Sequence, residues 1–107
     1  MGIESFGKNE EHFRRWEDIG TLKGVIFQLA VDVLPETILM YKLGGDLYED
    51  LKQALEDGIV NSGATDVRGI EEAAQRVFDD ELQKRGLFTP EASRTFLTKL
   101  KTEVEAR

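Results

Sequence analysis

Apolar and polar residues recur along much of this chain with the three-to-four-residue spacing of amphipathic helices. The clearest case is the segment from Ile70 to Arg85, whose apolar side chains lie three and four positions apart. A second apolar stripe begins at Leu47 and stops at Gly58, and a narrower one follows Pro90. Each of these patterns predicts one helix that packs an apolar face against a core.

Residues that favour helix starts stand just before two of these stripes. Asp46 is followed three positions later by Glu49, which is close to a capping box. Thr89 precedes Pro90, and proline suits the first position of a helix because its missing N–H would have no partner there. These signals place helix starts at residues 46–47 and 89–90.

The most apolar part of the chain, residues 25–34, is ambiguous between helix and strand. Every second residue is apolar, as in a strand, whereas Gly24, Gln28 and Asp32 lie four apart and would form one polar stripe on a helix. We favour a buried helix because the neighbouring segments are helical and a lone strand would have no partner. The alternative is an α+β fold with a strand pair that involves residues 25–34.

Two more helices are predicted beside this segment. One starts after Asn9 and ends at Gly20, and the other begins where Pro35 breaks or kinks the chain. Taken together, the patterns predict an all-α fold: a compact bundle of five or six short helices. We expect residues 1–107 to form one helical domain, because no stretch of the sequence is typical of a linker.

Charge is unevenly distributed along this acidic chain, whose net charge is −7. Residues 46–81 contain eleven acidic and three basic side chains, whereas residues 82–107 contain three acidic and six basic ones. The last helix could therefore offset the acidic middle within one molecule, or it could meet the acidic face of another subunit. The residues of this candidate interaction surface are Glu49, Asp50, Glu56, Asp57, Glu71, Glu72, Asp79, Asp80, Lys99 and Lys101.

Asp32 and Glu36 are the most unusual charged residues, because they lie in the apolar stretch 22–43. A carboxylate buried there must find a partner or take up a proton. If Pro35 only kinks one helix, the two carboxylates share a side and can meet Arg14, Arg15 or a basic residue of the last helix. We predict a buried structural ion pair, with a catalytic carboxylate pair as the alternative.

Several chemical functions find no support in the residues. The chain has no cysteine, its one histidine has no metal-ligand spacing around it, and Ala64 stands where a phosphate-binding loop needs lysine. We therefore assign no catalytic, cofactor-binding or metal-binding residue and expect a protein that is not an enzyme and needs no cofactor. The apolar stretch holds too many charges for a membrane span, and the basic residues are too few for direct nucleic-acid binding.

Three functions remain as hypotheses, and we expect a cytoplasmic location for each. The first is a small protein–protein interaction or assembly module that binds another protein or itself, as a homo-oligomer. The second is an acidic inhibitor, similar to an antitoxin, that blocks a basic nucleic-acid-binding site and requires the eight acidic residues above to form one continuous surface. The third is a small enzyme with a buried carboxylate site at Asp32 and Glu36, or with an anion site near Thr65.

Overall fold

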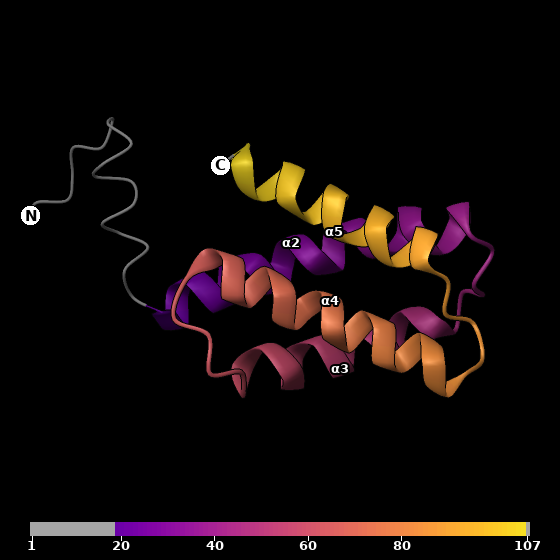
Figure 1. Ribbon diagram of the computed structural model, residues 1–107, viewed down its shortest axis with the longest axis horizontal. Helices are drawn as coiled ribbons and strands as arrows, with labels where there is room; N and C mark the ends of the chain where they lie inside the picture. The colour runs from indigo at the N-terminus through magenta and orange to yellow at the C-terminus, as the bar shows by residue number, and fades with distance from the viewer. Residues whose placement is uncertain (1–18, 107) are drawn as a thin grey trace, which may run out of the picture.

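The computed structural model describes residues 19–106, which form four α-helices joined by short turns (Figure 1). The helices are α2 (Ile19–Met40), α3 (Leu47–Val60), α4 (Val67–Lys84) and α5 (Pro90–Glu105). The all-α prediction is confirmed, and the predicted five or six helices are four in the described part of the chain. The helix predicted after Asn9 falls almost entirely outside the described residues.

One long helix replaces the shorter elements predicted between residues 20 and 43. Gly20 does not end a helix in the described residues, and Pro35 lies inside α2 and starts no new element. Residues 25–34 are helical, so the strand alternative is wrong, and the predicted polar stripe of Gly24, Gln28 and Asp32 is exposed. Proline removes only one N–H from the helical ladder, and packing of α2 on three neighbours offsets that loss.

The bundle is organised around α2 and α4, as Figure 1 shows. Helix α2 packs against α3, α4 and α5, and α4 also packs against α3 and α5. In the described part of the chain α3 and α5 do not touch each other, so they lie on opposite sides of the α2–α4 pair. Helix α2 is the most apolar of the four described helices.

The core contains one side-chain stripe from each helix. Phe78 of α4 and Phe96 of α5 stack in parallel, with ring centroids 4.4 Å apart and an interplanar angle of 1°. Both rings are fully buried, as are the leucines and isoleucines around them. Burial of these large apolar side chains supplies most of the stability of the domain.

Of the two capping residues predicted for α3 and α5, Thr89 makes its capping hydrogen bond and Asp46 does not, and Asp66 is a cap that was not predicted. The Asp66 carboxylate accepts a hydrogen bond from the Gly69 amide at 2.8 Å, and α4 therefore starts three residues before the predicted Ile70. The Thr89 hydroxyl accepts from the Ala92 amide at 3.1 Å, as predicted for α5. Helix α3 starts after Asp46, but its carboxylate makes no capping hydrogen bond.

Candidate functional site

The acidic residues of α3 and α4 meet along the line where these helices pack. Asp57 and Asp80 line a hollow of about 570 Å³, and Asp50 lines an adjoining hollow of about 350 Å³ together with Asp57 and Glu81. We refer to the surface formed by Asp50, Asp57, Asp80 and Glu81 as the α3–α4 groove.

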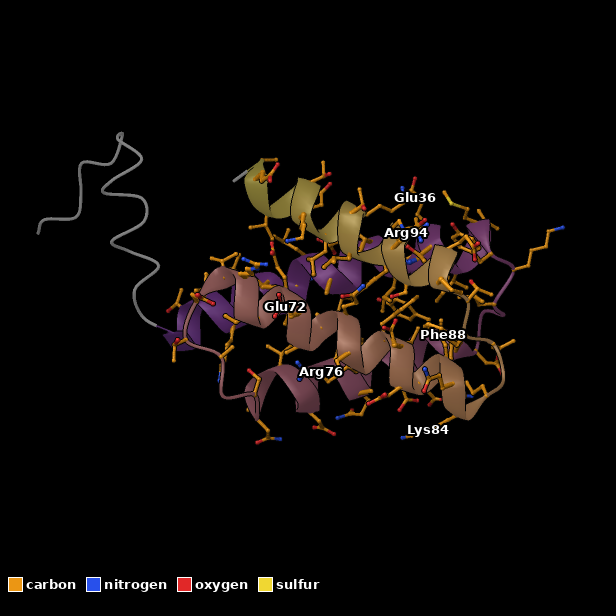
Figure 2. The ribbon with its side chains drawn as sticks, in the orientation of Figure 1. Glu36, Glu72, Arg76, Lys84, Phe88 and Arg94 are labelled. Carbon is orange, nitrogen blue, oxygen red and sulfur yellow. The ribbon has the colours of Figure 1, made fainter. Side chains whose placement is uncertain are left out.

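Basic side chains at the C-terminal end of α4 neutralise part of this groove. Arg85 pairs with Asp50, and its guanidinium also lies 3.8 Å from the Glu81 carboxylate. The Lys84 ammonium approaches Glu81 to 3.2 Å, and Figure 2 shows Lys84 at this end of α4. The groove therefore contains its own counter-charges, which reduces its attraction for a basic partner.

The remaining acidic residues of the predicted surface point elsewhere. Glu71 is buried between α4 and α5, where the Lys101 ammonium donates to its carboxylate at 3.0 Å. Glu72 is exposed and pairs with Arg68 at 3.3 Å, and its position on α4 can be followed in Figure 2. Asp79 is partly buried against α5. Glu49 and Glu56 are exposed on α3. The eight acidic residues therefore do not lie on one continuous surface, because the four that α4 carries lie on sides of this helix that face different neighbours.

Asp32 and Glu36 are exposed, which corrects the prediction that both are buried. The Asp32 carboxylate accepts a hydrogen bond from Gln28 at 3.3 Å, one turn earlier on α2. Glu36 pairs with Lys99 of α5 at 3.1 Å, so its partner is a basic residue of the last helix, one of the three partners considered, but the pair is at the surface and not buried. The sequence misled here because the polar stripe of α2 faces solvent while the residues on either side of it are buried.

Three polar side chains, Gln75, Asp79 and Ser93, lie together where α4 packs against α5. The Ser93 hydroxyl, which is buried, accepts a hydrogen bond from Gln75 at 3.0 Å and is the hydrogen-bond partner of the Asp79 carboxylate. The second carboxylate oxygen of Asp79, Oδ1, is inaccessible to solvent and has no hydrogen-bond partner among the described residues. Burial raises the pKa of Asp79, repulsion by Asp80 adds to the increase, and the Ser93 hydrogen bond opposes it.

We expect the substitution Asp79→Asn to stabilise the protein at neutral pH. Because the pKa of Asp79 is raised in the folded state, folding favours the protonated form, and stability falls as the pH rises through this pKa. The amide has no charge to desolvate, so the melting temperature at pH ~7 should increase by roughly 2–5 °C, and the gain should shrink toward pH ~4.

Thermal melts at both pH values test this expectation, with Glu103→Gln as a control that removes an exposed carboxylate from α5. The control should show little change, since that side chain is not desolvated. An Asp79→Asn variant that is less stable than the wild type at neutral pH would show that the ionised form makes a favourable interaction.

An apolar surface at the turn between α2 and α3 was not predicted from the sequence. Leu39 and Met40 are 79% and 51% exposed at the end of α2. Leu39, but not Met40, lines a hollow of about 640 Å³ whose lining is almost entirely apolar. We call this hollow and the two exposed side chains the apolar corner. The hollow is lined by Pro35, Ile38, Leu39, Lys42, Gly44, Gly45 and Tyr48.

The described residues show no arrangement that resembles a metal centre or a membrane span. Within residues 19–106, no three histidine, aspartate or glutamate side chains are grouped closely enough to hold a metal ion. None of the four described helices is long and apolar enough to cross a bilayer. No protein-family model, curated protein or solved structure matches the chain.

Proposed function

We propose that this protein is a small interaction module that self-associates through the apolar corner. The supporting observation is the exposure of Leu39 and Met40 beside an apolar hollow. Single exposed apolar residues are common in monomers, but neighbouring ones that border a concave apolar surface are typical of binding sites. Shielding them from water favours association, because the free energy gained grows with the apolar area removed from solvent.

The charges around the apolar corner favour a second copy of this chain as the partner. Lys42 lines the hollow on the α2 side, and Asp46 and Glu49 are exposed where α3 begins. Within residues 19–106, none of these three side chains has an ion-pair partner. A strongly acidic partner could pair only with Lys42, and a strongly basic one only with Asp46 and Glu49. A second copy of the chain carries both signs of charge, so each copy can pair with the other at all three residues.

The inhibitor and enzyme hypotheses receive less support from the geometry. The inhibitor requires one acidic surface, but Glu71 and Asp79 face α5 and the α3–α4 groove is partly neutralised. The enzyme requires a cleft at Asp32 and Glu36, and neither side chain lines the apolar hollow.

The oligomeric state tests the proposal directly. We expect the wild-type mass in sedimentation or light scattering to rise with concentration from that of the 12.1 kDa chain toward twice this value. The substitution Leu39→Glu places a charge at the centre of the apolar corner, so this variant should stay monomeric at concentrations where the wild type associates.

The matched control for this experiment is Val60→Glu. Val60 is 62% exposed at the end of α3, outside the apolar corner, so the substitution adds the same charge to another exposed apolar position. This variant should associate like the wild type. A wild-type chain that is monomeric at every soluble concentration contradicts the proposal, and so does an equal loss of association in both variants.

A further inference from the structure

Lys42 adopts a backbone conformation that favours glycine. Its φ is +54°, and it is the only non-glycine residue with positive φ in the described part of the chain. The Lys42 amide donates to the Leu39 carbonyl at 3.2 Å, and the Leu43 amide donates to the Ile38 carbonyl at 3.0 Å. These are the two hydrogen bonds of a Schellman motif, in which the left-handed residue after a helix is usually glycine.

A lysine at this position destabilises the fold relative to glycine, because its Cβ crowds the left-handed backbone. Strained residues of this kind are found preferentially at functional sites. No ion pair within residues 19–106 offsets this strain, because the Lys42 ammonium has no carboxylate within ion-pair distance there. Lys42 does lie on the wall of the apolar hollow.

We infer that Lys42 binds the carboxylates at the start of α3, Asp46 and Glu49, in a second copy of this chain. The inference depends on the proposed self-association and adds the polar contacts that orient it. In a dimer with two-fold symmetry, residue i of one copy contacts residue j of the other, and j contacts i. Lys42 of each copy then faces Asp46 and Glu49 of the other copy, so that the same ion-pair contact forms twice in the dimer.

Substitution of Lys42 by glycine separates a binding role from a structural one. In dilute, monomeric samples, Lys42→Gly should raise the melting temperature by a few degrees, because glycine tolerates the left-handed backbone. In concentrated samples, the same variant should self-associate several-fold more weakly than the wild type, because two ion pairs per dimer are lost. Unchanged association in this variant would overturn the inference.

Charge reversal with mixing tests the reciprocal pairing. Lys42→Glu and Glu49→Lys should each weaken self-association about tenfold, because each variant places like charges opposite one another. An equimolar mixture of the two variants should recover association close to that of the wild type, since both contacts of the mixed dimer then join opposite charges. Glu56→Lys is the control, because it makes the same charge change at an exposed position two turns further along α3.

The outcomes distinguish this inference from the proposed function. A wild-type chain that never associates removes both. A wild-type dimer whose affinity is unchanged in Lys42→Glu and Glu49→Lys leaves self-association in place and overturns the pairing. Weakening in both variants without recovery in the mixture also overturns it, because reciprocal contacts predict recovery.

Discussion

Replacement of Phe96 by alanine is expected to lower the free energy of unfolding by about 3–5 kcal/mol. The Phe96 ring is fully buried between the helices and stacks on Phe78, so its removal costs both burial and aromatic contact. Domains of this size have a total stability of about 5–15 kcal/mol, and the variant therefore loses a large part of it. Urea unfolding followed by circular dichroism measures the loss as a lower midpoint at an unchanged slope.

A leucine at the same position provides the control for Phe96→Ala. Phe96→Leu keeps most of the apolar volume, so its cost should be smaller, about 1–2 kcal/mol. A cycle that combines it with Phe78→Leu should reveal a coupling of about 0.5–1.5 kcal/mol, because each ring is the stacking partner of the other. A Phe96→Ala variant that loses less than about 1 kcal/mol would contradict the packing of α5 on the core.

The helices with one apolar face were predictable from the sequence. Helix α4 keeps a charged face exposed to solvent, so its buried residues Ile70, Ala74 and Phe78 show the helical period clearly in the sequence. Helix α5 was similarly predictable, because Thr89 and Pro90 act locally on the backbone and do not depend on tertiary contacts.

Helix α2 was divided incorrectly because its sequence lacks the usual signal. Apolar residues occupy most of its positions and only a narrow polar stripe interrupts them, so the helical period is weak. Gly20 and Pro35 then appear to be helix ends, although the contacts of a central helix stabilise it through both. The count of elements depends on this tertiary context, which single-residue preferences do not contain.

The candidate interaction surface was only partly predictable for a related reason. The separation of acidic and basic segments left contacts within the molecule and contacts between subunits as alternatives. Lys101 of the basic segment pairs with Glu71 of the acidic one, whereas Lys99 pairs with Glu36, outside the acidic segment. The direction of each acidic side chain depends on how α4 is rotated between α3 and α5, and charge pattern does not determine that rotation. Leu39 and Met40 were missed because they continue the apolar pattern of a helix that is otherwise buried.

Gly58 lies inside α3, at a point where this helix approaches α4 closely. Gly58 was predicted to end α3, but the helix continues to Val60. A Cβ atom built on Gly58 would lie 2.2 Å from Cγ2 of Val77, so α3 and α4 approach each other closely there. The same close approach brings Asp57 and Asp80 to one hollow, so this glycine positions the α3–α4 groove.

We expect Gly58→Ala to lower the free energy of unfolding by about 1–3 kcal/mol. Alanine normally stabilises a helix relative to glycine by about 1 kcal/mol. A net loss of stability in Gly58→Ala would therefore show that the steric conflict outweighs this gain. Val77 is β-branched and has one strongly preferred rotamer in a helix, so it cannot turn away at low cost and the helices must separate. Chemical unfolding of the variant measures the net effect.

Two further variants show whether the close approach of α3 and α4 is the cause. Gly24→Ala is the matched control: Gly24 is an exposed helical glycine with no atom within 4 Å of a built Cβ, so this change should stabilise by up to about 1 kcal/mol. Val77→Ala removes the clashing methyl group, so adding Gly58→Ala to it should cost nothing or should stabilise. If Gly58→Ala alone stabilises as much as Gly24→Ala, the helices are not in contact at this point, and the α3–α4 groove has a different shape.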